Sequence, residues 1–236
     1  MHTLLFHSFS QERHVDPFYD IDFYQYVELL TEIKRKISCN HEISIDDGFQ
    51  SSYNAIKFAH KLGFKTSLFI ITDNISRNGF LSKEEIKELS DMGCLIGSHT
   101  KTHTDLTTIS LENVEYELME SQNILSNITG KKIEYLSIPY GNYNQNVIKI
   151  SLRVFKSISI SRPNYIFDNS YLKGRFPIHR KNIMNKNQIM HFLNGNTPYF
   201  HLIRYQLLDF IKRLIVPSFY RKMKSVITSF RTIDIK

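Results

Sequence analysis

The chain has 236 residues, of which 42% are hydrophobic and 13% aromatic. This composition supplies enough apolar side chain for a buried core and excludes a wholly disordered chain. The net charge of +7 is unevenly distributed along the chain. Residues 201–236 hold eight Lys or Arg and two Asp, a net charge of +6, which leaves +1 for residues 1–200. A nearly neutral body argues against a nucleic-acid-binding face on that part of the chain.

The first residues and the cysteines bear on where the protein resides. The sequence has no run of 18 uncharged apolar residues, and its opening apolar stretch is too short, and lacks the basic residues, for a secretory signal. Two cysteines, Cys39 and Cys94, are too few for a disulfide scaffold, and we interpret them as reduced thiols. We therefore expect a soluble cytoplasmic protein, which could reach the inner face of the membrane through its basic tail.

Short β-like runs alternate along the chain with amphipathic helical segments. The expected strands are residues 4–9, 43–45, 66–71, 94–97, 135–138 and 157–160. The expected helices are residues 23–36, 52–62, 83–92, 111–126 and 144–155. Ser51 is the expected cap of the second helix, and Ser82 and Glu85 have the spacing of a capping box that opens the third.

This alternation predicts parallel strands covered by helices, in an α/β sheet or barrel. In such folds the functional loops follow the carboxyl ends of the strands. Three polar clusters occupy such positions, and they begin at Asp46, His99 and Pro139. We therefore take these clusters as the candidate functional residues.

Asp46 and Asp47 are adjacent carboxylates at the end of a predicted strand, and Gly48 lets the backbone turn sharply after them. Neighbouring side chains on a strand point to opposite faces, so the two acids can take different roles. A helix cap beside a solvated acid would give the same pattern. Taken alone, Asp-Asp-Gly is therefore a weak indication of a site.

His99 and His103 can converge on one ion if the chain turns helically after the strand. Neutral imidazoles with a carboxylate suit a divalent transition metal, and one Asp with two His leaves positions open for water and substrate. Two surface histidines in a polar loop are the alternative. The acids at another strand end favour the metal site.

Pro139, Tyr140 and Gly141 form a rigid turn at the end of the next strand. Its backbone N–H groups could face a developing oxyanion. Taken alone, a plain strand-ending turn explains the motif equally well.

The three motifs, in this order and at these spacings, resemble the polysaccharide deacetylase family, the NodB-homology domain of carbohydrate esterase family 4. The flanking sequence matches too, because SHTKTHTDL (residues 98–106) is followed by an amphipathic helix and by Gly-Lys-Lys (residues 130–132) before the Pro-Tyr-Gly turn. The opening FHSF (residues 6–9) resembles the first strand of the family. The resemblance covers about residues 3–195.

The resemblance implies a distorted (β/α) barrel that hydrolyses an acetyl group, most often N-linked, from a sugar of a cell-surface polysaccharide or its precursor. It implies a divalent metal, usually Zn²⁺ in this family, held by Asp47, His99 and His103. The expected partner is an N-acetylated carbohydrate rather than a nucleic acid.

The resemblance also assigns catalytic roles. Asp46 would be the general base, and the Tyr140 backbone N–H, beside Pro139, would bind the oxyanion and the substrate. This chemistry is coherent, because a metal ion polarises a carbonyl and lowers the pKa of its water to roughly 7. Asp46, near the metal without binding it, would complete the activation of that water.

One departure from the family concerns the partner of the base. Many members place an Arg two residues before the Pro of the third motif, where it pairs with the base, and here that residue is Ser137. The chain also has no Trp, so the Asp/Trp motif that supports this Arg elsewhere is missing in its usual form. We therefore expect Asp46 to lack a guanidinium partner and to have a less depressed pKa than in relatives with the pair.

The general acid stays open among several residues. The family often uses a His in a Leu-x-His motif, and His179, in FPIHR (residues 176–180), is the nearest candidate. The same segment equally resembles a Pro-Arg-Ile strand of branches that lack this His, with Arg180 as the matching residue. His7, at the end of the first strand, either faces the same mouth or is a core histidine.

We predict a deacetylase domain over residues 1–198 and a basic amphipathic helical tail over residues 199–236. Five apolar residues of the tail recur at helical spacing, namely Ile203, Leu207, Phe210, Ile211 and Leu214. This face could contact an anionic membrane or pack on the barrel. Two rival classes of function are a non-catalytic carbohydrate-binding relative that keeps the barrel and a membrane-peripheral interaction protein.

Overall fold

The computed structural model describes residues 2–10, 19–37, 41–161, 171–183 and 185–195. Residues 1–195 form one compact unit, to which the description below refers. The amphipathic tail expected over residues 199–236 lies outside the described residues, so it stays a prediction. Within the described part of the chain, no helix combines the length and the apolar composition that crossing a membrane requires.

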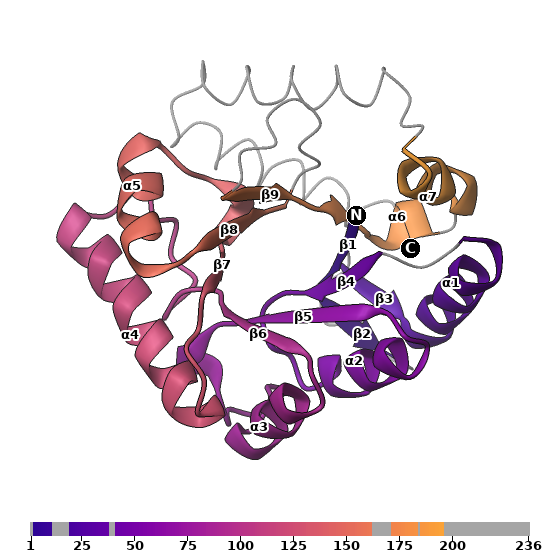
Figure 1. The fold of residues 1–236 in the computed structure, drawn as a ribbon, viewed down its shortest axis with the longest axis horizontal. Helices are drawn as coiled ribbons and strands as arrows, with labels where there is room; N and C mark the ends of the chain where they lie inside the picture. Colours follow the sequence, from indigo (N-terminus) through magenta and orange to yellow (C-terminus); the bar gives the residue numbers. More distant parts are fainter. Residues whose placement is uncertain (1, 11–18, 38–40, 162–170, 184, 196–236) are drawn as a thin grey trace, which may run out of the picture. The chain divides into compact units, whose positions relative to one another are not determined.

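Eight strands form a nearly closed barrel in the order β10-β1-β4-β5-β6-β7-β8-β9, and every neighbouring pair is parallel (Figure 1). The strands are β1 (Thr3–Phe6), β4 (Glu42–Ile45), β5 (Lys65–Ile70), β6 (Leu95–Ser98), β7 (Tyr135–Ser137), β8 (Ser157–Ile160), β9 (Leu172–Gly174) and β10 (Phe176–Pro177). A second, two-stranded sheet pairs β2 (Ser8–Ser10) with β3 (Asp20–Asp22). The barrel expected from the sequence is confirmed.

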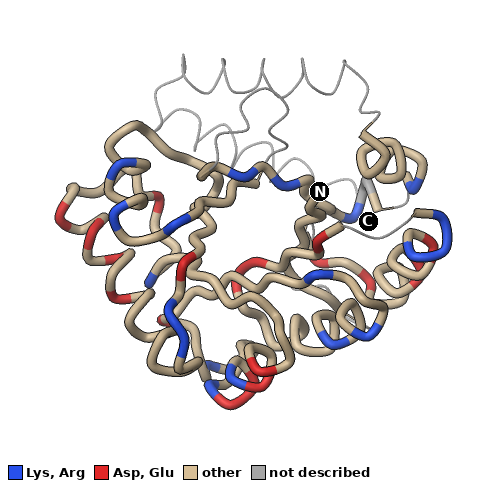
Figure 2. Tube along the Cα trace, in the orientation of Figure 1, with Lys and Arg blue, Asp and Glu red and all other residues tan. Residues whose placement is uncertain are grey.

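The helices lie around the outside of the strands (Figure 1). They are α1 (Phe23–Lys36), α2 (Ser52–Lys61), α3 (Lys83–Asp91), α4 (Leu111–Thr129), α5 (Gln145–Val154), α6 (Arg180–Ile183) and α7 (Lys186–Leu193), with the 3₁₀ turns η1 (Thr72–Asn74) and η2 (Pro139–Gly141). Basic and acidic residues are interspersed over the outer helices (Figure 2). This mixture agrees with the nearly neutral charge of the first 200 residues.

Local side-chain chemistry explains where the helices begin. Asp22 caps α1 by accepting hydrogen bonds from the N–H groups of Tyr24 (2.8 Å) and Gln25 (3.1 Å). The predicted capping box of α3 is confirmed, because the Ser82 hydroxyl accepts from Glu85 N–H and the Glu85 carboxylate accepts from Ser82 N–H.

The cap expected at Ser51 takes a different form. Ser51 does precede α2, but its hydroxyl accepts a hydrogen bond from the N–H of Phe9, at 3.1 Å, and makes no cap bond. The first strand differs as well, because the expected strand of residues 4–9 is divided at His7 into β1 and β2. This division places His7 at the carboxyl end of β1.

The strands alternate between the helix-facing core and the barrel interior, as period-two side-chain geometry requires. Ile43 and Ile45 of β4 join the hydrophobic core, whereas Ser44 between them contacts Arg175. The interior also holds the Phe69 ring of β5. A Cβ atom on Gly97 of β6 would lie only 2.5 Å from that ring, so the glycine makes room for it.

Cys94 is buried, and it is a free cysteine in the described part of the chain. Burial raises the pKa of its thiol to about 12, so the group is an inert thiol at neutral pH. This agrees with the expected reduced state of Cys94. Cys39 lies outside the described residues.

Candidate active site and metal centre

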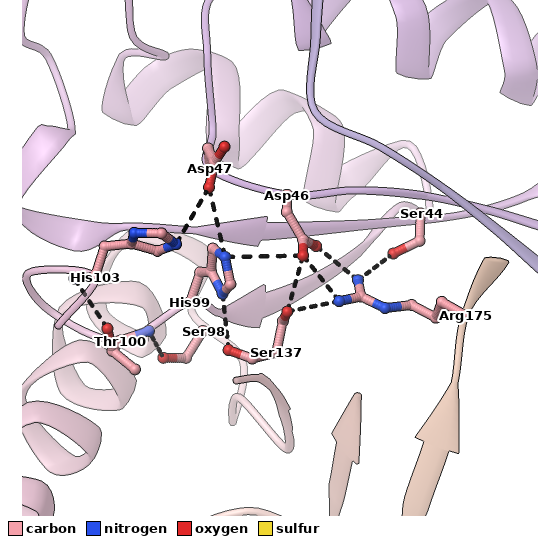
Figure 3. Close-up of polar contacts among 9 residues, drawn as sticks. All are labelled: Ser44, Asp46, Asp47, Ser98, His99, Thr100, His103, Ser137 and Arg175. Atoms are coloured by element: carbon pink, nitrogen blue, oxygen red, sulfur yellow. Dashed lines mark hydrogen bonds and ion pairs between the residues drawn. The ribbon is translucent and has the colours of Figure 1, made fainter. Parts of the chain in front are cut away.

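The predicted functional residues gather at the carboxyl ends of the barrel strands. Asp46 and Asp47 follow β4, His99 follows β6, and the η2 turn that contains Tyr140 follows β7. Figure 3 shows the side chains of Asp47, His99 and His103 turned toward one another, with Asp46 beside them. The parallel arrangement therefore brings together residues that are far apart in the sequence.

The backbone at this edge is strained. Described non-glycine residues with positive φ are Asp47 (76°), Ser76 (62°), Thr100 (65°), His103 (64°) and Tyr140 (59°). Four of these five belong to the motifs that the sequence singled out. Such conformations cost of order 1–3 kcal/mol each and persist only where the surroundings hold them, which is typical of functional sites.

Asp47, His99 and His103 form a group whose ligand atoms all lie within 4.8 Å of one another. Asp47 Oδ1 lies 3.4 Å from His99 Nε2 and 3.7 Å from His103 Nε2, and the two imidazole rings are 4.7 Å apart. That oxygen is buried and has no hydrogen-bond partner within the described residues. A cation between the three atoms would satisfy it.

The tautomer of His99 suits a metal ligand. Its Nδ1–H donates to the backbone carbonyl of Ser137 at 2.7 Å, which leaves Nε2, 3.4 Å from Asp47 Oδ1, as the nitrogen that can bind a metal when it is unprotonated. Burial, together with the charge of His99, lowers the pKa of His103 to about 4, so that imidazole is neutral at pH 7. The donor set of two imidazoles and one carboxylate fits a divalent transition metal.

The acids at the site are ionised. Burial alone would raise the pKa of Asp47, but His99 and His7 outweigh burial and lower it. For His99 the signs are reversed. Burial alone would lower the pKa of this imidazole, but Asp46 and Asp47 raise it above its usual value. A proton therefore competes with a metal ion for His99.

Asp46 forms a buried, bidentate ion pair with Arg175. The two guanidinium nitrogens donate to the two carboxylate oxygens at 2.6 and 2.8 Å, and both side chains are almost fully buried. Ser44 accepts a further hydrogen bond from Arg175, at 2.8 Å (Figure 3). Ser137 accepts from Arg175 at 2.7 Å and donates to Asp46 at 2.9 Å.

The expectation that Asp46 lacks a guanidinium partner is therefore wrong, and so is the expected weak depression of its pKa. Burial alone would raise the pKa of Asp46, but Arg175, and then His99, hold that pKa well below its usual range. The Arg comes from the end of β9 instead of β7, and the small side chain of Ser137 lies beside its guanidinium. Arg180, which the sequence matched to the Pro-Arg-Ile strand of branches that lack the histidine, is exposed at the start of α6.

Tyr140 lies at the rim of the site, on the turn that Pro139 begins. Pro139 is buried, whereas the side chain of Tyr140 is 53% exposed and its ring lies 4.7 Å from that of His103. Asn142 ties this turn to the histidine loop by donating a hydrogen bond to Asp105 at 2.9 Å. The turn is therefore fixed beside the metal group with one aromatic face open.

The two candidates for the general acid lie at the ends of neighbouring strands. His7 follows β1, and its ring lies tilted against that of Tyr19, with the ring centroids 4.3 Å apart. Burial lowers the pKa of His7, while Asp47 and Asp46 act in the opposite direction, so this ring lies within electrostatic reach of both acids. His179 follows β10, where its carbonyl accepts a hydrogen bond from Ile183 N–H of α6.

Comparison with known proteins agrees with this geometry. Residues 40–154 match the family model described as polysaccharide deacetylase. This region belongs to the polysaccharide deacetylase family. The match contains both acids, both histidines and the Pro-Tyr-Gly turn, so the family anticipated from the three motifs is confirmed.

Curated relatives match about half of the chain. "Putative polysaccharide deacetylase YxkH" of Bacillus subtilis is 29% identical over 122 residues, which cover 51% of this chain and 44% of that protein. "Peptidoglycan-N-acetylmuramic acid deacetylase PdaA" of Bacillus subtilis is 28% identical over 117 residues, which cover 48% and 42%. The chain thus spans less than half the length of these relatives.

Solved structures of deacetylases share the fold. The polysaccharide deacetylase BC0361 from Bacillus cereus superposes with a TM-score of 0.68 at 22% identity, over 78% of this chain and 68% of that chain. Streptococcus pyogenes deacetylase PplD, solved with acetate, gives 0.66 at 16% identity, over 79% and 97%. At these identities the likeness establishes the barrel and leaves the chemistry to the site residues.

Proposed function

We propose that this protein is a metal-dependent deacetylase that hydrolyses an N-linked acetyl group from a sugar of a cell-surface polysaccharide or its precursor. The observation that carries the proposal is the Asp47-His99-His103 group beside the separate, ionised Asp46. Three ligands with a neighbouring base suit the metal-assisted hydrolysis of an acyl group. Zn²⁺ is the ion that the family resemblance favours.

The proposed division of labour rests on the surroundings of each acid. A divalent cation held by Asp47, His99 and His103 would polarise the acyl carbonyl and activate a water. Asp46 would take a proton from the attacking water, since its Oδ2 lies only 3.8 Å from His99 Nε2 without belonging to the ligand group. Arg175 keeps Asp46 ionised for this role.

The turn at Pro139 and Tyr140 would serve the acyl group and the sugar. We assign the Tyr140 backbone N–H to the developing oxyanion, because the turn is fixed beside His103. The exposed ring of Tyr140 offers an apolar face of the kind that lines ligand sites. These roles predict an acetylated sugar bound across the rim of the site.

We assign the general acid to His179, the nearest match to the histidine motif of the family, with His7 at the end of the neighbouring strand β1 as the second candidate. His7→Gln and His179→Gln separate the two candidates. The variant that lacks the acid should lose about 10²–10⁴-fold in turnover, while the other keeps most of it.

The test of the proposed function is acetate release from a panel of N-acetylated sugars, both free and lipid-linked. We expect release from at least one class, loss of release after chelation, and recovery on addition of Zn²⁺, with Co²⁺, Ni²⁺ and Mn²⁺ compared. Binding of a sugar without release, by protein loaded with each of these metals, would favour a non-catalytic carbohydrate-binding protein instead. The expected lack of a guanidinium partner for the base was an argument for that alternative. Because Asp46 pairs with Arg175, this argument no longer holds.

A further inference from the structure

The loop that carries both histidines is held through its backbone N–H groups. The N–H of His99 donates to the carbonyl of Ile70, at 2.9 Å. Thr100 N–H donates to the hydroxyl of Ser98, and His103 N–H donates to the hydroxyl of Thr100 (Figure 3). These bonds fix the two ends of the loop and leave the N–H groups of residues 101 and 102 to be satisfied.

Glu117 of α4 binds those two groups. Its Oε2 accepts from Lys101 N–H at 3.0 Å and from Thr102 N–H at 2.9 Å, and its Oε1 accepts from the Thr102 hydroxyl at 2.8 Å. Only 7% of the residue is exposed. A buried carboxylate is costly unless it is well hydrogen-bonded, and these three bonds all come from the histidine loop.

The loop needs such support because its backbone is strained on both sides of these contacts. Thr100 and His103 have φ values of 65° and 64°, in the left-handed region that ordinary side chains disfavour. The carbonyl side of the loop is held separately, since the N–H groups of Thr72 and Asp73 donate to the carbonyls of Thr100 and Lys101. Glu117 thus supplies the opposing half of a clamp.

We propose that Glu117 is a positioning residue of the metal centre. It holds the His99–His103 loop in the strained conformation that directs both imidazoles at Asp47, without touching the metal or the substrate. This inference rests on the proposed function only for the use of the site, because the hydrogen bonds of the clamp are made by protein groups alone.

The charge of Glu117 is the feature to test. In Glu117→Gln, one amide oxygen can still accept from the two N–H groups, and the Thr102 hydroxyl can turn to accept from the amide nitrogen. The shape is therefore retained while the charge-assisted strength is lost. Glu115 provides a matched control, because Glu115→Gln makes the same change on an exposed position of the same helix.

The experiment measures binding of Zn²⁺ and of Co²⁺ to the apo proteins, together with amide hydrogen exchange at residues 101 and 102 without metal. For Glu117→Gln we expect metal affinity to fall about 10- to 100-fold, the Co²⁺ absorption spectrum to change, and both amides to exchange faster than in the wild type. Glu115→Gln should match the wild type in all three measurements. Thr102→Val removes the hydroxyl bonds to Glu117 and to Thr104 and keeps both N–H bonds to Glu117, so it should show a smaller loss in the same direction.

Unchanged metal affinity and unchanged amide exchange in Glu117→Gln would overturn the inference while leaving the proposed function intact. A wild-type protein that binds no metal would instead count against the proposed function, and the amide exchange would still decide whether Glu117 clamps the loop. If Glu117→Gln does not fold, Thr102→Val decides the matter, and wild-type exchange and affinity in that variant would contradict the clamp.

Discussion

Arg175 determines the charge of the proposed base, Asp46. Both side chains are buried, and the ion pair is completed by hydrogen bonds to Ser44 and Ser137. Removing one partner of such a pair leaves an uncompensated charge in the interior, which typically costs 3–5 kcal/mol. The pair therefore contributes both to the pH range of the base and to the stability of the barrel.

The first prediction concerns Arg175→Gln. Without the guanidinium, burial dominates the pKa of Asp46 and raises it, so the base is protonated at higher pH than in the wild type. The acid limb of the kcat/KM profile should then move upward. Arg180→Gln, at an exposed position on α6, is the control and should leave the limb in place. A folded, active Arg175→Gln with an unmoved acid limb would contradict the pairing.

Only part of the site could be predicted from residue patterns. The two acids, the two histidines and the Pro-Tyr-Gly turn are short motifs at strand ends, so their chemistry is visible in the sequence. Arg175 lies 129 residues from Asp46 and belongs to no recognised motif. The two side chains meet only because the last strands close the barrel. The available signal was a basic residue in an otherwise apolar segment, GRFPI (residues 174–178).

At the scale of elements, β5 and β6 support the ion pair from inside the barrel. The Arg175 guanidinium lies over the Phe69 ring at 5.0 Å, a favourable cation–π distance. The ring in turn occupies the space that Gly97 leaves open. The absence of a side chain at Gly97 of β6 thus leaves room for Phe69, which supports the Arg175 partner of Asp46.

The second prediction is that Gly97→Ala destabilises the protein. The new methyl group would collide with Phe69, and overpacking of a core typically costs about 1–3 kcal/mol. Urea unfolding measures this loss. Adding Phe69→Leu should make the double variant more stable than the sum of the two single effects. Strictly additive changes in the free energy of unfolding would show that the Phe69 ring does not restrict the side chain at position 97.

The helices were easier to predict from sequence than the last strands. The range expected for α1 and that expected for β8 agree with the structure, and the capping box of α3 is present. β9 and β10 were not predicted, because they have three and two residues and are too short to show a periodic pattern. Their pairing with β8 and β1 depends on long-range closure of the sheet.

At the scale of the whole molecule, the charge is divided between a nearly neutral body and a basic tail. Residues 199–236 lie outside the described structure, so their role is argued from sequence alone. Each Lys or Arg near an anionic membrane contributes about 1 kcal/mol of attraction, which salt screens. A lipid-linked sugar substrate would give such a tail a purpose.

The third prediction is that the full chain sediments with vesicles of phosphatidylcholine and phosphatidylglycerol at low salt, and less at high salt. Truncation after Thr197 should abolish this binding without loss of bound metal. Vesicles of phosphatidylcholine alone are the control and should bind neither form. A truncated chain that is insoluble or unfolded would show that the apolar face of the tail belongs to the core.

The central claim is that Asp46 acts beside the metal group and not within it. The most direct test measures bound metal and acetate release on the same preparation of Asp46→Asn, with the exposed Asp91→Asn as control. We predict that Asp46→Asn keeps about one metal ion per chain and loses about 10²–10⁴-fold in acetate release, whereas His99→Ala loses both. Substantial activity in Asp46→Asn, or loss of its metal together with its activity, would contradict the account.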